Sequence, residues 1–297
     1  MTEGIAISSD NNVTPRISEF RRFLRIFMGR GLVVFGLVIV VMFVILAIFA
    51  DQIAPYDPLK RNLYEALQQP NAQHWLGTDA IGRDTLSRLI HGARISLIVG
   101  ILVVAISGVI GVALGAISGY FGGLLGAVIM RVMDMLMTIP MMVLALAISA
   151  LLGGGLKNVV MALGVGLIPG YARMMASSVM VAKETDYVMA EHTMGASTLR
   201  ILLRHILPNC FSPILVMVTM MMGTTVLAEA GLSFIGIGIT PPTPAWGGMV
   251  TDGRLYLLTN PMLSMAPGIA IILLVFSFNM VGDGLRDALD PRLRGII

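Results

Sequence analysis

Residues 95–130 read ISLIVGILVVAISGVIGVALGAISGYFGGLLGAVIM and contain no charged side chain. As one helix these 36 residues would extend about 54 Å at 1.5 Å per residue. Crossing the hydrocarbon core of a bilayer takes only roughly 20 residues, so the chain must turn within the stretch. Gly119-Tyr120-Phe121-Gly122-Gly123 is the place for that turn, because glycine permits the backbone angles of a tight turn. The sequence predicts two membrane-spanning helices here, at 95–118 and 124–151.

The whole chain has the composition of a membrane protein. Of its 297 residues, 56% are hydrophobic and 12% are charged, whereas soluble domains have about 25% charged residues. Other apolar stretches predict spans at 31–50, 158–181, 208–229 and 264–282. The first is longer than the signal-peptide core of about 7–15 residues, so it is interpreted as a retained span. The fold expected is an all-α polytopic membrane protein with six transmembrane helices.

The distribution of lysine and arginine predicts the orientation, because cytoplasmic loops carry an excess of both. The N-terminal segment 1–30, the loop after the fourth span and the C-terminal tail are rich in them: Arg16, Arg21, Arg22, Arg25 and Arg30; Lys183, Arg200 and Arg204; Arg286, Arg292 and Arg294. Both termini are therefore expected in the cytoplasm. Residues 51–94 hold five basic and five acidic residues and are expected to form an extracytoplasmic loop.

Missing motifs exclude several chemistries. The ATP-binding Walker motif ends in Gly-Lys followed by Ser or Thr, and none of Lys60, Lys157 and Lys183 follows a glycine. The zinc-protease pattern H-E-x-x-H and the G-x-S-x-G elbow are absent as well. Cys210 is the only cysteine, which excludes a disulfide framework. The basic residues form no nucleic-acid motif, and no catalytic residue, metal or cofactor is expected in this chain.

The loop between the fourth and fifth spans, residues 183–207, reads KETDYVMAEHTMGASTLRILLRHIL. Its apolar residues recur at helical spacing, which predicts two short helices joined at Gly195. Pro208 suits the first turn of the fifth span, where its missing N–H is no loss. From the pattern alone, this hairpin fits docking into a soluble partner and lying on the lipid surface equally well.

This loop resembles the coupling loop of ABC importer permeases, whose pattern is E-A-A, three residues, Gly, nine residues and I-x-L-P. Ala190, Gly195, Leu207 and Pro208 match in register, whereas Met189, Glu191 and His205 depart from the pattern. We consider that Glu191 substitutes for the glutamate missing at 189. The resemblance implies that ATPase subunits bind the loop through the following residues: Asp186, Tyr187, Ala190, Glu191, Gly195, Ala196, Ser197, Leu207 and Pro208.

Three further segments, 76–97, 231–247 and 282–291, resemble signatures of the C-type permease subunit in the dipeptide, oligopeptide and nickel branch of that family. The outer-loop signatures comprise Gly77, Thr78, Asp79, Gly82, Arg83, Asp84, Ser87 and Arg88, then Pro241, Pro242, Trp246 and Gly247. The resemblance implies the type I ABC importer permease fold, with residues 95–297 as the permease core, in the bacterial inner membrane.

The residues of these segments also allow a structural interpretation. Thr78 or Asp79 is expected to cap a short amphipathic helix, along which Arg83, Asp84 and Arg88 pair. Direct contact with a binding protein is the alternative role of this region. Residues 230–251 contain three prolines and five glycines, so they are expected to form a loop or a re-entrant segment. Trp246 is expected in a cap at the outer mouth, at the headgroup level.

Two features lie within the predicted spans. Arg131 and Asp134 have i, i+3 spacing, which predicts an intramembrane ion pair on one helix face. Its role is structural or, alternatively, to line the solute path. Gly111, Gly115 and Gly119 repeat every four residues, a spacing that lets two helices approach closely in lipid.

The resemblance implies a permease subunit of an ATP-driven importer. Its partners would be a second homologous permease, two cytoplasmic ABC ATPases that carry ATP and Mg, an extracytoplasmic solute-binding protein and the lipid bilayer, without nucleic acid. The solute expected is a di- or oligopeptide, with nickel or another small solute as the alternative. Two other classes stay open, a stand-alone secondary transporter or channel and a non-transporting scaffold. The ionisable residues near the span ends weigh against the first, and the coupling loop against the second.

Overall fold

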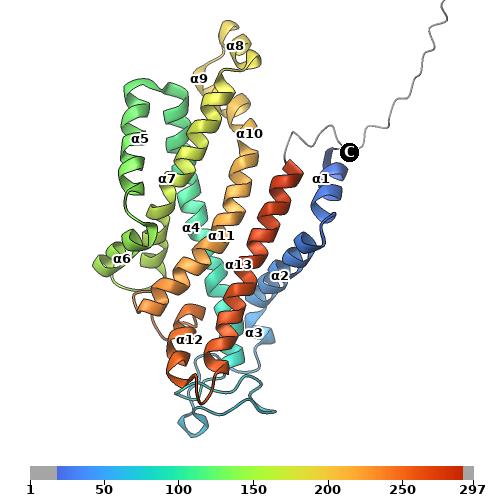
Figure 1. Cartoon of the computed structure of the whole chain (residues 1–297), viewed down its shortest axis with the longest axis vertical. Coiled ribbons are helices and arrows are strands. Elements are labelled where there is room, and N and C mark those ends of the chain that lie inside the picture. Colours follow the sequence, from blue (N-terminus) through green and yellow to red (C-terminus); the bar gives the residue numbers. More distant parts are fainter. Residues whose placement is uncertain (1–18, 290–297) are drawn as a thin grey trace, which may run out of the picture.

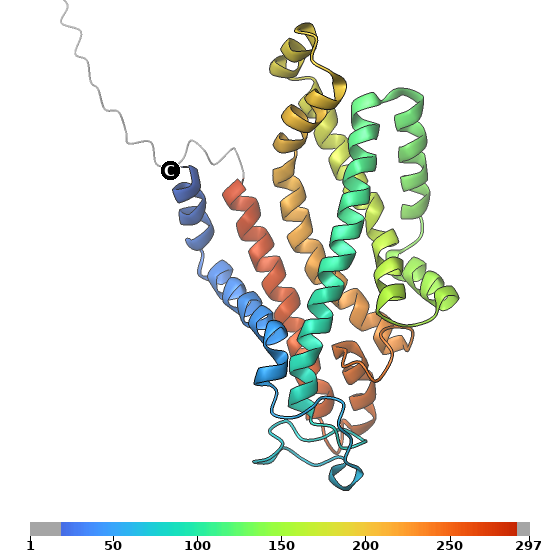
Figure 2. The same ribbon diagram turned by 180° about the vertical axis from the view of Figure 1, so that it is seen from behind.

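The structure, a computed structural model, describes residues 19–289. Arg16, Arg292, Arg294 and the end of the 282–291 signature lie outside the described residues. The long helices run along the long axis of the molecule (Figure 1, and from behind in Figure 2). In chain order the α-helices are α1 (Glu19–Met28), α2 (Gly31–Ile48), α3 (Ala50–Ile53), α4 (Thr85–Phe121), α5 (Gly123–Met137), α6 (Met141–Leu152), α7 (Leu156–Lys183), α8 (Asp186–Thr193), α9 (Thr198–Arg200), α10 (Leu207–Asn209), α11 (Phe211–Ile235), α12 (Trp246–Gly253) and α13 (Met262–Leu289). Three further short helices are η1 (Leu63–Glu65), η2 (Ile201–Ile206) and η3 (Arg254–Tyr256).

Five helices within residues 19–289 are long and apolar enough to cross a membrane: α2, α4, α7, α11 and α13. Together, α5 and α6 meet the same criterion, although they meet at a bend of 86°. The prediction of an all-α polytopic membrane protein is confirmed. Six spans result if the bent pair is counted as one.

The bend between α5 and α6 lies at Pro140. Proline has no N–H to donate, and it disfavours the helical conformation at the residue before it. Pro140 is extended, with φ −52° and ψ 131°, and the Thr138 hydroxyl donates to the carbonyl of Met135 at 2.6 Å where α5 ends. The predicted uninterrupted helix over 124–151 is therefore wrong, because it passes through Pro140.

The turn predicted at Gly119–Gly123 is confirmed. Helix α4 ends at Phe121, and Gly122 follows with φ +60°, a conformation that glycine adopts without steric cost. Helix α5 then runs back beside α4, and the Ser118 hydroxyl donates to the carbonyl of Gly126 at 3.1 Å. The long uncharged stretch is thus divided between two helices.

Helix α4 begins earlier than the predicted start at residue 95. Asp84 caps it, since a carboxylate oxygen of Asp84 accepts from the N–H of Ser87 at 2.7 Å. The prediction that Thr78 or Asp79 caps a separate short helix is wrong, because both residues precede the cap in an irregular segment. With 37 residues, α4 is about 55 Å long and so extends well beyond the hydrocarbon layer of about 30 Å.

Helices α4 and α7 cross at a stripe of glycines. A Cβ atom on Gly111 would lie 2.5 Å from the Cβ of Tyr171, and one on Gly115 would lie 2.3 Å from the carbonyl oxygen of Ala172. At Gly119 the corresponding distance to the Ala176 carbonyl oxygen is 2.6 Å. The close packing predicted from this spacing is confirmed, with α7 as the partner helix.

The proline-rich segment 236–245 leads into α12, which packs between α11, α13 and α4. Trp246 begins α12 and is fully buried. Its indole N–H donates to the carbonyl of Leu89 at 2.9 Å, and its ring meets that of Phe43 edge to face at 5.3 Å. A side chain on Gly92 would collide with this ring, at 2.4 Å. Trp246 thus fills a gap between helices, and its expected position at the headgroup level stays a prediction.

The two ends of the molecule differ in structure. Helices α8 and α9 lie toward the same end as α1 and the C-terminal end of α13, which we call the hairpin end (Figure 1). Residues 54–84 and α12 lie at the opposite end, the loop end (Figures 1 and 2). The residues singled out in the sequence fall mainly at these two ends.

Candidate functional site

The predicted coupling loop forms a helical hairpin at one end of the molecule (Figure 1). Its first arm, α8, ends at Thr193, and Gly195 follows with φ +79°. This left-handed conformation suits glycine. The N–H of Gly195 donates to the carbonyl of His192 at 3.0 Å, and that of Ala196 to the carbonyl of Glu191 at 3.1 Å. These bonds satisfy carbonyls at the end of α8, and the predicted turn at Gly195 is confirmed.

The second arm of the hairpin runs without a break into a membrane-crossing helix. It comprises α9, the wider π-helical turns of η2 and then α10, which joins α11 at Cys210. Pro208 lies in the first turn of α10. Because the proline ring crowds the preceding turn and offers no N–H, a local widening of the helix just before it is understandable. The second arm is therefore joined to α11 through the single residue Cys210.

Apolar side chains on the inner face attach the hairpin to the long helices. Val188 is 1% exposed, and Ile201 and Ile206 are fully buried. They belong to a cluster with Met175 and Val179 of α7, which also includes Ala116, Cys210 and Ile214. The hairpin is therefore packed onto α4, α7 and α11.

Two polar contacts add to this attachment. The hydroxyl of Tyr120, near the end of α4, lies 3.1 Å from Nε2 of His192. The side-chain amide of Asn209 donates to the hydroxyl of Tyr187 at 2.8 Å. No local pattern in the sequence pointed to Tyr120, because its partner lies 72 positions further along the chain.

Glu191 faces inward across the hairpin. Its carboxylate lies 3.5 Å from Nε2 of His205 on the second arm, so two of the residues that depart from the family pattern contact each other. Met189 stands exposed on α8 instead. The idea that Glu191 takes over the role of a glutamate at position 189 is not supported, because Glu191 is engaged within the hairpin.

The hairpin exposes several large apolar side chains among polar and charged ones. Five are exposed: Tyr187, Met189, Met194, Leu199 and Leu203. Of the other residues that the family pattern singled out, Asp186, Ala190, Gly195, Ser197 and Pro208 are exposed, and Ala196 and Leu207 are half-buried. Several exposed large apolar side chains on one hairpin indicate an interaction surface.

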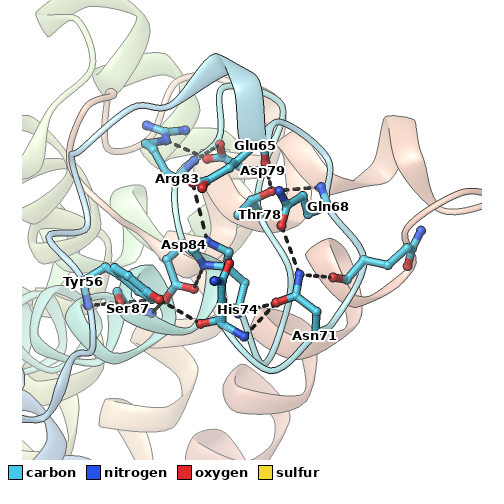
Figure 3. A network of polar contacts seen from close by, with 12 residues as sticks. Tyr56, Glu65, Gln68, Asn71, His74, Thr78, Asp79, Arg83, Asp84 and Ser87 are labelled. Atoms are coloured by element: carbon cyan, nitrogen blue, oxygen red, sulfur yellow. Dashed lines mark hydrogen bonds and ion pairs between the residues drawn. The ribbon is translucent and has the colours of Figure 1, made fainter.

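At the loop end, residues 54–87 fold over the start of α4 through a polar network (Figure 3). One oxygen of Asp84 accepts from the N–H and the hydroxyl of Ser87, both at 2.7 Å. The other lies 2.8 Å from Nδ1 of His74, which is itself buried. The N–H of Tyr56 donates to the hydroxyl of Ser87 at 3.0 Å. Asp84 thus joins the helix cap to the folded segment.

A second part of the network surrounds Asp79. Nε of Arg83 donates to one Asp79 oxygen at 2.6 Å, and the N–H groups of Ile81 and Arg83 donate to the other, both at 3.0 Å. Nε of Arg88 lies 3.6 Å from the same carboxylate. The predicted pairing of Arg83 and Arg88 with Asp84 is wrong, because Asp79 pairs with both arginines and Asp84 with His74.

Two glycines allow this segment to fold tightly. Gly77 and Gly82 both have φ +73°. A Cβ on Gly82 would lie 1.8 Å from the carbonyl oxygen of Asn62. Thr78 donates its hydroxyl proton to the carbonyl of Glu65. The signature over 76–88 therefore combines turn residues and ion pairs that shape one rigid cover.

The predicted intramembrane ion pair has a different partner. Asp134 of α5 is joined to Arg173 of α7 at 2.5 Å, rather than to Arg131. The two helices run side by side, so Arg173 reaches Asp134 across the interface, and Arg131 stands exposed on α5. Asp134 and Arg173 are themselves about half exposed. A charged pair exposed on a helix face is costly wherever that face meets hydrocarbon.

Two family models match the chain. "Binding-protein-dependent transport system inner membrane component" matches residues 111–295. "N-terminal TM domain of oligopeptide transport permease C" matches residues 18–70. The first covers more than half of the chain, including the hairpin, all of α7 and part of α4.

Individual relatives agree with these matches. The chain is 41% identical over 290 residues to the glutathione transport system permease protein GsiD of Escherichia coli O6:K15:H31, covering 97% of this chain and 94% of the relative. It is 43% identical over 290 residues to GsiD of Shigella flexneri serotype 5b, with the same coverage.

A solved structure supports the fold. The MetNI methionine ABC transporter, in an inward-facing conformation, contains a chain that superimposes with a TM-score of 0.53 at 19% identity, covering 68% of this chain and 97% of that chain. At this identity the likeness speaks for the fold, which is that of an ABC importer permease. The chain therefore belongs to the family of binding-protein-dependent transport system inner membrane components, and it is the permease subunit of an ABC importer, a multi-pass protein of the bacterial inner membrane.

Proposed function

We propose that this chain and a second homologous permease together form a path across the inner membrane for short peptides, glutathione among them. The relatives named for glutathione transport support this solute class, as does the match to the oligopeptide permease model. Glutathione is itself a short peptide, so both comparisons point to the same chemistry.

The hairpin over residues 183–207 is the observation that carries the proposal. It exposes five large apolar side chains and is packed onto α4, α7 and α11, in a chain whose sequence holds no nucleotide-binding motif. The cytoplasmic ATPase subunits would bind these exposed residues. When ATP binding closes them, the hairpins of the two permeases move together, and the packed contacts pass that movement to the crossing helices.

The arrangement of the two ends supports an orientation. If the hairpin contacts cytoplasmic ATPases, then α1 and the end of α13, which lie at the hairpin end (Figure 1), face the cytoplasm too. Residues 51–84 and α12 then face the exterior, where a solute-binding protein delivers its cargo. This orientation agrees with the arginines at Arg21, Arg22 and Arg25, because such residues are enriched on the cytoplasmic side.

In this proposal the second permease packs against α5 and α7. The Asp134–Arg173 pair is half exposed on that face, and a charged pair facing lipid is costly. Contact with a second permease, or with the solute path between the two, removes this cost. We therefore place the pair at the permease interface.

The test is ATP hydrolysis and uptake by the complete complex reconstituted in liposomes. Gly195→Pro forbids the observed φ of +79°, since proline fixes φ near −65°, and should abolish stimulation of ATP hydrolysis by the loaded binding protein. Gly195→Asn is the matched control, because asparagine tolerates left-handed angles. Normal stimulation in the proline variant, or ion-driven uptake by this chain alone, would contradict the proposal. Competition between labelled dipeptide and glutathione then identifies the solute.

A further inference from the structure

A pocket of about 250 Å³ opens at the loop end, between residues 79–83, the first turn of α4 and the α12–η3 segment. Much of its wall is apolar, with Met249, Leu255 and Leu263 among the lining residues. Two guanidinium groups, those of Arg83 and Arg88, also line it. An apolar pocket with a few convergent polar groups is the usual form of a small-ligand site.

Arg88 has a hydrogen-bonding capacity that the protein does not use. Its side chain is 5% exposed, and its Nη1 is buried with no hydrogen-bond partner among residues 19–289. Among the described residues, the carboxylate within ion-pair distance is that of Asp79, at 3.6 Å from Nε. Leaving a buried charged donor unpaired is unfavourable, so this end of the guanidinium is suited to receiving an anion.

Asp79 does not neutralise both arginines. Its carboxylate already accepts from Nε of Arg83 at 2.6 Å and from the N–H groups of Ile81 and Arg83 at 3.0 Å. With these bonds the charge of Asp79 is matched by that of Arg83. The hydrogen bonds that Asp79 accepts therefore leave Nη1 of Arg88 without a partner among the described residues.

Asp252 of α12 is the other acidic residue in the lining. Its side chain is exposed, and no ion pair between described residues joins it to Arg83 or Arg88. Desolvation by its surroundings raises the pKa of Asp252, although Arg88 and Arg83 act in the opposite direction. Asp252 therefore stands at the mouth of the pocket and leaves Nη1 of Arg88 unpaired.

We propose that this pocket binds a carboxylate group attached to a small apolar body, with the carboxylate on Arg88 and the apolar part against Met249, Leu255 and Leu263. The planar fork of an arginine matches the two oxygens of a carboxylate. Asp79 and Asp252 flank the site and repel a second negative charge, so a monocarboxylate is favoured over a phosphate. The site is defined by the chain's own residues and does not depend on the proposed transport function.

The direct test uses trifluoroacetate as a fluorine NMR probe, with the complete complex in lipid nanodiscs. Wild-type complex should broaden the trifluoroacetate line in a saturable way, and hexanoate should displace the probe more effectively than acetate does, because of the apolar wall. Arg88→Gln should weaken probe binding by about ten-fold or more, the factor that corresponds to one lost charged hydrogen bond. Arg61→Gln, an exposed arginine outside the lining, should leave probe binding unchanged.

Two more variants keep the test decisive if Arg88→Gln fails to assemble. Ala80→Trp places a large ring at the rim of the pocket without altering any charge, and it should prevent binding. Asp252→Asn removes a negative charge from the mouth and should tighten binding. Saturable broadening that is equal in wild type, Arg88→Gln and Ala80→Trp overturns the proposal, as does broadening no greater than that caused by empty nanodiscs.

Competition distinguishes the sources of the carboxylate. Displacement of trifluoroacetate by a peptide alone assigns the site to the terminal carboxylate of a solute. Displacement by the solute-free binding protein assigns it to an acidic side chain of that protein at the outer surface. If neither displaces the probe while binding still depends on Arg88, the ligand is a free monocarboxylate.

Discussion

Gly115 lies where α4 crosses α7, and it illustrates how one missing side chain sets the distance between two helices. A Cβ there would lie 2.3 Å from the carbonyl oxygen of Ala172, which is backbone and cannot move without shifting α7. We expect Gly115→Val to lower the free energy of unfolding by about 1–3 kcal/mol, measured as a lower unfolding midpoint of the purified protein. Gly164→Ala is the control, because nothing lies within 4 Å of that position on α7. Equal losses in both variants would count against close packing as the cause.

Asp51 gives a prediction about pH. It lies in α3, beyond the first crossing helix, and its carboxylate accepts from Nη2 of Arg94 at 3.0 Å and lies 3.1 Å from Nε2 of His91. These hydrogen bonds, that of Arg94 first, lower the pKa of Asp51 below its ordinary value of 3.8. A carboxyl group with a lowered folded-state pKa stabilises the fold above its unfolded pKa, and this stabilisation is lost as the pH falls through the folded pKa.

The measurement is the unfolding midpoint of wild type and Asp51→Asn as a function of pH. Near neutral pH the variant should unfold at a lower temperature, and the difference should disappear as the pH falls below 3.8, the ordinary value for the aspartate carboxyl. Asp57→Asn is the control: the oxygen that accepts from the N–H of Leu59 is retained in asparagine. A difference that persists unchanged into acid would show that Asp51 acts through packing rather than through its charge.

The hairpin of α8 to α10 has two faces, and neighbouring residues separate their roles. Val188 is buried against the long helices, whereas Met189 is exposed on the open face. We expect Val188→Asp to lower stability by burying an unpaired charge. We expect Met189→Asp to leave stability unchanged and to reduce stimulated ATP hydrolysis of the complex by about ten-fold, the equivalent of about 1.4 kcal/mol of docking energy. Both quantities are measured on the same reconstituted preparations.

The opposite result has a clear meaning. If Met189→Asp unfolds the hairpin while stimulated hydrolysis per folded complex is normal, the exposed face is not the docking surface. Met194→Asp, at the end of α8 and 73% exposed, repeats the test at a second position.

The sequence was sufficient to predict those features that depend on residues close together in the chain. The turn at Gly122, the turn at Gly195 and the glycine stripe of α4 were all read from glycine positions, because glycine is required where the backbone turns sharply or where two helices touch. Pro140 was an equally local signal for the bend, but the prediction followed the apolar residues around it and treated 124–151 as one helix. The start of α4 was misplaced because Arg88 and Arg94 resemble the end of a span, while the helix continues beyond them and is buried under the folded segment that precedes it.

The partners of individual charged residues were not available from spacing. Asp134 pairs with Arg173, which is 39 positions away, and Asp84 pairs with His74 rather than with either neighbouring arginine. Spacing along one helix identifies possible partners on that helix only, whereas tertiary packing brings together residues from different helices. The buried position of Trp246 has the same origin, because its ring occupies the space beside Gly92, which has no side chain.

At the scale of the whole molecule, the proposed orientation can be tested by labelling. Cys210 is 3% exposed, so Cys210→Ala provides a background free of native thiols. Tyr64→Cys places a thiol at the loop end and Met189→Cys at the hairpin end, both at exposed positions. In intact spheroplasts, an impermeant maleimide should label the first variant and not the second. Permeabilising the membrane should make both react, and labelling of Met189→Cys before that step would reverse the orientation.

Helix α4 joins the two ends of the molecule without interruption. Its first residues are fixed by Asp84 and the polar segment around it, and near its last residues Tyr120 contacts His192 of the hairpin. Helix α4 has no proline, so no break of that kind separates the two anchors. In the proposed orientation, contact with a binding protein outside and docking of an ATPase inside would therefore be linked through one continuous helix.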